Sequence, residues 1–254
     1  MRTYLTFLNK ELLESRRSYR FLIMVLAFII IGIMNPLIAK LTPTLLENFM
    51  PEGMNIVIPI PTAMDSWAQF FSNTNQIGIL VVLILFSGIL SKEISKGTLI
   101  NMVTKGLPRV TIILAKFSYL FITWTVCFLV NFFITYIYTI FLFEGTELPA
   151  LAFSVFSLWL FGILLLAIIL FAATLVKSSY GTLLITGGFI IAGFLVAIAP
   201  GAYRFNPLSL ASQNLAMLGD VHPIQDFYPL IGITIGLIFI FLIVAMVIFR
   251  KKQL

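Results

Sequence analysis

The feature that most constrains this chain is a series of six long apolar runs, separated by polar segments. An α-helix needs about 20 mostly apolar residues to cross the hydrocarbon core of a bilayer. Backbone groups in lipid have no water to bond, so a spanning segment of this kind must satisfy its own hydrogen bonds by forming a helix. The expected spans are residues 19–41, 74–92, 110–143, 148–176, 180–199 and 228–249.

The composition supports a membrane protein of the all-α class. Hydrophobic residues make up 60% of the chain and charged residues only 10%, whereas a soluble domain carries about 25% charged residues. The apolar residues are spread along the whole length, so we expect residues 1–254 to form one transmembrane domain. The single cysteine, Cys127, lies within an apolar run and excludes a disulfide framework.

The distribution of positive charge predicts the orientation. If the N-terminus is cytoplasmic and there are six spans, all of the 16 lysines and arginines except Lys40 and Arg204 fall on the cytoplasmic side. This is the pattern of the positive-inside rule. It places both termini in the cytoplasm, and it explains the net charge of +6 without a nucleic-acid partner.

Residues 3–18 are predicted to form an amphipathic helix in the plane of the membrane interface. At 100° per residue, one side carries Tyr4, Leu5, Leu8 and Leu12. The other side carries Thr6, Lys10, Glu14 and Arg17. A solvated N-terminal helix is the alternative.

Two outside loops are expected to be long. Residues 42–76 contain four prolines and a short helix candidate at 62–71. Residues 200–227 contain a second helix candidate at 207–218, with Asn206 as a plausible cap and Gly219 as a plausible stop. We expect that helix to rest on the membrane surface or dip into it.

Several chemistries have no matching residues. The chain has no P-loop motif, no H-E-x-x-H and no G-x-S-x-G, and the one histidine, His222, cannot build a zinc site alone. No ionisable residue lies near the centre of a span, where ion-coupled carriers commonly place one. We therefore expect no catalytic, cofactor or metal residues in this chain, and any transport energy should come from a partner.

The segment from Ser91 to Arg109, between the second and third spans, is the most informative. It contains an amphipathic stretch over 98–104, which Thr98 can cap and which Gly106 and Pro108 can stop. Its apolar side carries Leu99, Met102 and Val103. A short cytoplasmic helix of this kind suits docking into a groove on a soluble protein; a simple connecting loop is the alternative.

This segment resembles the permeases of the ABC-2 type. The resemblance rests on Glu93, on Gly97-Thr98-Leu99, on Pro108-Arg109 and on Lys116, together with the six spans and the N-terminal helix. One departure is Lys105-Gly106-Leu107, where the family often has a run like Ser-Leu-Pro. The difference concerns the conformation of the turn more than its role.

The resemblance implies a bacterial ABC exporter of the cytoplasmic membrane. Two membrane subunits, identical or different, would pair with two cytosolic ATPases, which would bind ATP and Mg²⁺. The coupling helix, residues 97–105 here, would dock on the ATPase, and Glu93 would pair with basic residues where the second span meets the cytosol. The residues that the resemblance assigns to coupling are Glu93, Gly97, Thr98, Leu99, Met102, Val103, Lys105, Pro108 and Arg109.

Small residues at four-residue spacing occur in the last two spans. The pairs are Gly188 with Ala192, Gly193 with Ala197, and Gly232 with Gly236. Such pairs let helix backbones approach closely. They predict either a dimer seam along the fifth span or packing within one subunit.

The polar residues within the spans are mild ones: Ser87, Ser91, Asn131, Thr135 and Thr186. A pathway lined by them and by Leu, Ile and Phe suits an amphipathic cargo better than an ion. The chain is similar in style to Gram-positive exporters of antimicrobial or cytolytic peptides, including those of phenol-soluble modulins. A gradient-driven secondary transporter and a non-transporting immunity or sensor protein are the alternatives.

Overall fold

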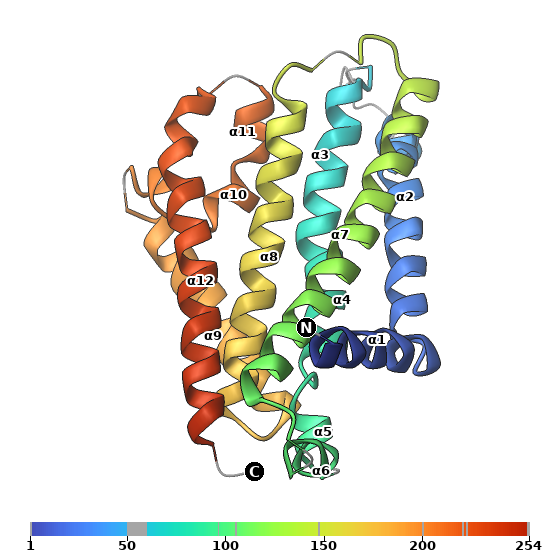
Figure 1. Ribbon diagram of the computed structural model, residues 1–254. Coiled ribbons are helices and arrows are strands. Elements are labelled where there is room, and N and C mark those ends of the chain that lie inside the picture. Colours follow the sequence, from blue (N-terminus) through green and yellow to red (C-terminus); the bar gives the residue numbers. More distant parts are fainter. Residues whose placement is uncertain are drawn as a thin grey trace.

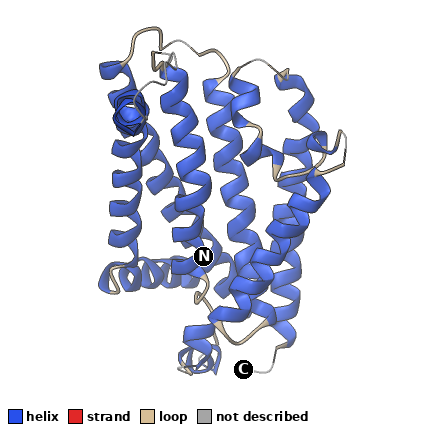
Figure 2. Ribbon diagram, turned by 180° about the vertical axis from the view of Figure 1, so that it is seen from behind, coloured by secondary structure: helices blue, strands red, loops and turns tan. Residues whose placement is uncertain are grey.

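The computed structural model describes residues 2–49, 60–95, 97–104, 106–146, 148–199, 201–219, 221 and 223–252. Over these residues the chain consists of helices and connecting loops (Figure 2). Six helical segments of the described residues are long and apolar enough to cross a membrane. The prediction of an all-α polytopic membrane protein is confirmed.

The elements follow one another as a series of antiparallel spans. Before the third span come α1 (Arg2–Arg17), α2 (Arg20–Phe49), α3 (Ala63–Asn73), a π-helical turn (Thr74–Gly78), α4 (Ile79–Phe86), α5 (Ser91–Ser95) and α6 (Thr98–Thr104). Then come α7 (Arg109–Leu142), α8 (Leu151–Leu175), α9 (Ser179–Ala197), α10 (Ser209–Ser212), α11 (Asn214–Leu218) and α12 (Tyr228–Lys251), with 3-10 turns at Ala202–Arg204 and Ile224–Phe227.

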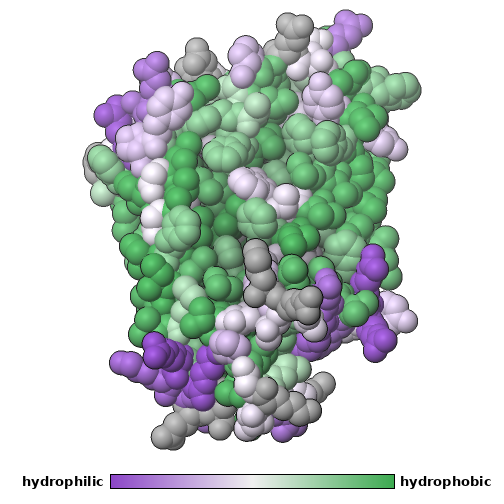
Figure 3. Space-filling model, viewed as in Figure 1, coloured by the Kyte–Doolittle hydropathy of each residue, from purple (hydrophilic) through white to green (hydrophobic). Residues whose placement is uncertain are grey.

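Helix α1 lies across the axes of the spans at one end of the bundle, and α5 and α6 project beyond it (Figure 1). We call this the basal end, and the opposite end, where α7 meets α8, the distal end. Tyr19, at φ 57°, makes the sharp turn from α1 into α2. Apolar side chains cover the middle of the surface and hydrophilic ones gather at both ends (Figure 3), as expected where hydrocarbon surrounds the middle.

Helix α8 forms the centre of the bundle. Every residue from 161 to 170 is buried, and α8 packs against α7, α9 and α12. Helices α2, α3 and α7 form the other half of the core, around Phe28, Trp67 and Trp124. Helix α9, in contrast, is buried mainly along the side that faces α8.

The first two spans are longer than predicted. Helix α2 continues to Phe49 instead of ending at 41, with Pro36 and Pro43 inside it. Pro36 removes the N–H that would bond the carbonyl of Gly32, and the Thr135 hydroxyl donates to that carbonyl instead, at 3.2 Å. The helix therefore passes through the proline without an unsatisfied carbonyl there.

The helix predicted in the first outside loop is part of the second span. Helix α3 runs directly into the π-helical turn and α4, so residues 63–76 are not loop. The polar residues that suggested a loop are bonded to other spans: Ser66 lies 2.7 Å from Thr139, and Asn73 donates to Asn35 at 2.9 Å. Residues 50–59 lie outside the described residues.

A layer of polar side chains, all buried except the partly buried Asn73, surrounds the π-helical turn. Asn131 of α7 donates to Thr74 at 2.9 Å, and Asn35 of α2 donates to Thr135 at 2.9 Å. The polar layer, as we call Asn35, Asn73, Thr74, Asn131 and Thr135, joins three helices by hydrogen bonds. Such bonds between membrane helices contribute about 0.6 kcal/mol each.

The predicted helix at 207–218 is two short helices, α10 and α11, broken at Gln213. Asn206 was the predicted N-cap, but the residue directly before α10 is Leu208. Its amide donates to the carbonyl of Gly193 at 2.7 Å, and its oxygen accepts from the N–H of Leu208 at 3.1 Å. The segment folds back onto α8, with Leu210 and Met217 fully buried, rather than lying on the membrane surface.

The buried face of α1 also differs from the predicted apolar stripe. The buried residues are Phe7 and Glu11, at 5% exposure each, and Ser15, at 4%, whereas Leu5 of the predicted stripe is 55% exposed. Tyr4 remains on the inner face and donates to the Ser118 hydroxyl at 2.6 Å. A charged residue, Glu11, is thus drawn into the side that periodicity assigned to apolar residues.

We predict that Gly162→Ala destabilises the bundle and that Gly232→Ala does not. A Cβ at Gly162 would overlap the Trp124 ring, whereas one at Gly232 would meet nothing within 4 Å. Overpacking a core costs about 1–3 kcal/mol, and both changes bring the same helix propensity. Thermal unfolding in detergent should show a lower midpoint for Gly162→Ala alone. Equal midpoints would contradict the close packing of α7 on α8.

Candidate functional site

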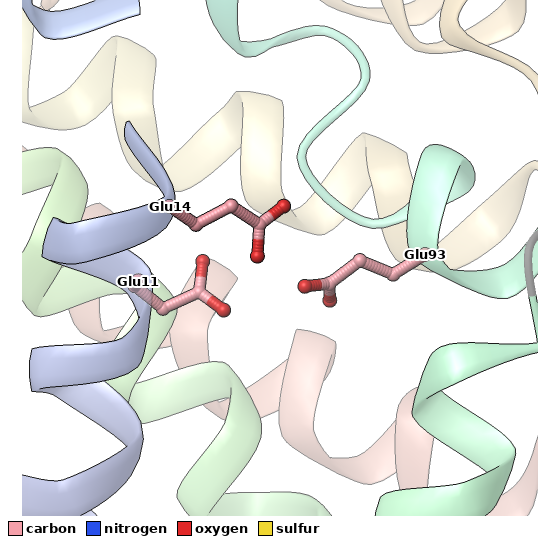
Figure 4. Close-up of side chains that lie close together, drawn as sticks. All are labelled: Glu11, Glu14 and Glu93. Atoms are coloured by element: carbon pink, nitrogen blue, oxygen red, sulfur yellow. The ribbon is translucent and has the colours of Figure 1, made fainter. Parts of the chain in front are cut away.

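A cluster of charged side chains, of which Glu11, Glu93 and Lys116 are buried, joins α1, α5 and α7 at the basal end. The Lys116 ammonium, 1% exposed, lies 3.0 Å from Glu11 Oε2 and 2.7 Å from Glu93 Oε2. Lys10 lies 2.5 Å from Glu93 Oε1 and 2.8 Å from Glu14 Oε2. Figure 4 shows the three carboxylates facing one another from α1 and α5. We call these five residues the ion cluster.

The ion cluster compensates its own buried charge. Removing an ammonium from water is costly unless carboxylates face it, and Lys116 has one on each side. For Lys10, burial alone would lower the pKa, but Glu11, Glu14 and Glu93 outweigh it and raise the pKa above its ordinary value. Lys10 therefore stays charged at neutral pH and holds α1 against α5.

Three carboxylates this close also resemble a cation site. Oxygens of Glu11, Glu14 and Glu93 lie within 4.8 Å of one another. The Lys10 and Lys116 ammonium groups already bind these oxygens at ion-pair distance, so a metal would have to displace a lysine. The arrangement is better explained as a structural link than as a metal site.

The expected pairing of Glu93 with basic residues at the end of the second span is present in the structure. The partners are Lys116 and Lys10. The Lys116 side chain is buried, because Glu11 and Glu93 bind its ammonium group. The contribution of Glu11 was not predicted, since its spacing gave no sign that a lysine 105 residues later would face it.

Gly97 and Gly106 set the two ends of α6. Both have positive φ, 68° and 91°, which a side chain would disfavour. Thr98 is the first helical residue rather than the cap, and its hydroxyl donates to the Glu93 carbonyl at 3.2 Å. This bond ties the start of α6 to the residue that enters the ion cluster. Lys105 lies outside the described residues.

The apolar side of α6 faces the protein itself. Leu99 is fully buried, and Met102 and Val103 pack partly against the same core. These residues therefore attach α6 to the bundle and are not a free docking surface. The exposed side consists of Thr98, Ile100, Asn101 and Thr104.

Arg109 links the end of this segment to the last span. Its Nη1 donates to the carbonyls of Phe249 and Arg250, at 3.2 and 3.1 Å, and also to that of Lys252. These carbonyls belong to the C-terminal end of α12, where cations are favoured. Lys252 in turn donates to the carbonyl of Thr174, at the end of α8, at 2.7 Å. Pro108 is exposed and precedes the first residue of α7.

The pairs of small residues differ in their surroundings. A Cβ at Gly193 would lie 3.5 Å from Leu208, so this residue packs within the same chain, whereas Gly188, Gly232 and Gly236 have open space. Ala192 and Ala197 are exposed on α9. The pair Gly188 and Ala192 therefore stays free for a second helix, and Gly193 does not.

Three of the five mild polar residues of the spans lie fully inside the helix bundle instead of lining an open path. Asn131, Thr135 and Thr186 are fully buried. The first two belong to the polar layer, and the Thr186 hydroxyl donates to the Thr182 carbonyl of its own helix at 2.8 Å. Their partners are inside the bundle, so they stabilise it. Ser91 is different, because its hydroxyl lies 3.0 Å from that of Ser179 and connects α5 to α9.

We predict that Lys116→Met destabilises the protein far more than Lys251→Met, because Lys251 is exposed. Removing one partner of a buried pair costs about 3–5 kcal/mol, and without Lys116 the three carboxylates of the ion cluster would share Lys10 as their one remaining lysine. The thermal midpoint in detergent should fall clearly for Lys116→Met only. Similar midpoints for both variants would show that the cluster is not a stabilising link.

Comparison with known proteins supports the membrane assignment. No family model matches the chain. The chain is 22% identical over 219 residues to YxlG, an uncharacterized transmembrane protein of Bacillus subtilis (strain 168), and this similarity covers 84% of each protein. The similarity to a transmembrane protein spans most of both chains, and it agrees with the six membrane-length helices among the described residues of this chain.

Proposed function

We propose that this protein is the membrane-spanning subunit of an ATP-driven exporter of the ABC-2 type in a bacterial cytoplasmic membrane. The observation that carries the proposal is the way in which α6 is attached to the bundle while its other side stays exposed. This short helix projects beyond α1 at the basal end (Figure 1), is attached by its apolar side, and keeps Thr98, Ile100, Asn101 and Thr104 exposed. A helix fixed in this way is suited to receive a force from a soluble partner.

The contacts around α6 support a route by which such a force reaches the spans. Glu93, just before α6, binds Lys116 of α7 and Lys10 of α1. Ser91 contacts Ser179 at the start of α9, and Arg109 binds the end of α12. Displacement of α6 would therefore act on the second, third, fifth and sixth spans together, as an exporter that opens by rearranging its spans requires.

The energy source and the second subunit are part of the proposal. ATP and Mg²⁺ would bind to a cytosolic ATPase, and a second permease subunit, identical or different, would complete the pathway. The exposed apolar side of α9, with Gly188 and Ala192, supports a contact with that subunit. An amphipathic cargo, such as an antimicrobial or cytolytic peptide of the phenol-soluble modulin kind, fits the apolar spans.

We predict that Ile100→Asp reduces association with the partner ATPase at least about tenfold. Ile100 is 38% exposed on α6, and a buried contact at an interface centre contributes about 1–2 kcal/mol. The measurement is co-purification of the protein from its native membranes, followed by identification of any P-loop ATPase that accompanies it and by assay of ATP hydrolysis.

Two variants act as controls for that experiment. Val221→Asp makes the same kind of change at an exposed residue between α11 and α12 and should leave association intact. Leu99→Asp should lower the yield of folded protein, because Leu99 is buried. If Ile100→Asp and Val221→Asp retain equal amounts of ATPase, or if no ATPase co-purifies with the unmutated protein, the proposal fails.

A further inference from the structure

A pocket of about 440 Å³ lies where α1 crosses α2 and α7. Helix α1 supplies its basal side, and Phe21 of α2 and three residues of α7 supply the rest. The lining residues are Asn9, Leu12, Leu13, Ser15, Arg16, Phe21, Tyr119, Ile122 and Val126. None of them belongs to α6 or to the ion cluster.

The lining changes from polar to apolar along the axis of the bundle. Helix α1 supplies all but one of the polar lining residues, namely Asn9, Ser15 and Arg16, together with Leu12 and Leu13. Helix α7 runs from the basal to the distal end, so Ile122 and Val126 lie progressively deeper, and both are exposed, at 38% and 40%. The pocket thus combines the polar side chains of Asn9 and Arg16 at the depth of α1 with an apolar lining that continues toward the distal end.

The α1 side of the pocket carries positive charge that the described residues leave unpaired. Arg16 lies beside Arg17 at the end of α1, and no ion pair of the described chain involves either of them. The carboxylates of α1, Glu11 and Glu14, bind Lys116 and Lys10 in the ion cluster. No carboxylate lines the pocket itself.

We propose that this pocket binds one anionic phospholipid of the adjoining leaflet. The lipid phosphate would accept hydrogen bonds from Arg16, and one acyl chain would lie against Phe21, Ile122 and Val126. Basic pockets between membrane helices at interface depth suit anionic head groups. The apolar part of the pocket favours a lipid over free phosphate, because free phosphate has no acyl chain to contact it.

The first test compares two arginines that differ in their place relative to the pocket. Arg16→Gln should weaken retention of phosphatidylglycerol about fivefold, equivalent to about 1 kcal/mol. Arg17→Gln removes the same charge from the next residue, which does not line the pocket, and should have a much smaller effect. The full-length protein is taken from vesicles of phosphatidylcholine and phosphatidylglycerol, and bound lipid is counted by native mass spectrometry.

The second test concerns the acyl chain. Val126→Trp should fill the interior and reduce retained phosphatidylglycerol at least about threefold, whereas Ile137→Trp, on the exposed side of the same helix, should not. Neither change alters charge, and the thermal midpoint of each variant confirms folding. Equal retention by Arg16→Gln and Arg17→Gln, or by Val126→Trp and Ile137→Trp, would overturn the proposal and indicate unspecific surface lipid.

Discussion

The Lys116 ammonium and the carboxylates on either side of it constrain the whole basal end. An ammonium at 1% exposure requires opposite charge at contact distance, and here one carboxylate comes from α1 and the other from α5. If helix α1 left the bundle, the buried Lys116 ammonium would lose the Glu11 carboxylate. The position of α1, the course of the chain into α6 and the pocket beneath α1 all depend on this arrangement.

The sequence was sufficient for the fold class and for most spans. Long apolar runs have one solution in a bilayer, and α7, α8, α9 and α12 begin and end within three residues of their predicted bounds. The first two spans were wrong where polar residues or prolines interrupt the apolar run. Ser66 and Asn73 look like loop residues until their hydrogen bonds to Thr139 and Asn35 are known, and hydropathy contains no information about such partners.

For the candidate site, residue type and motif identified Glu93, Gly97 and Arg109, whose structural reasons are now clear. Glu93 enters the ion cluster, Gly97 has a positive φ, and Arg109 binds the end of α12. Periodicity found the apolar side of α6 but not what covers it. An amphipathic pattern states that a face is buried, and whether its own protein or a partner buries it depends on contacts distant in sequence.

The π-helical turn at Thr74–Gly78 has a consequence for the geometry of the second span. The N–H of Ile79 bonds to the carbonyl of Thr74, so this turn holds one residue more than an α-helical turn. Winding it into a regular α-helix would rotate α4 by about 100° and advance it by about 1.5 Å. Val82 and Phe86 would then face away from the core that now buries them. The extra residue in this turn therefore sets the rotation of the basal half of the second span relative to its distal half. An uninterrupted α-helix has no such extra residue, so a change in this turn would couple rotation of the basal half to its movement along the helix axis.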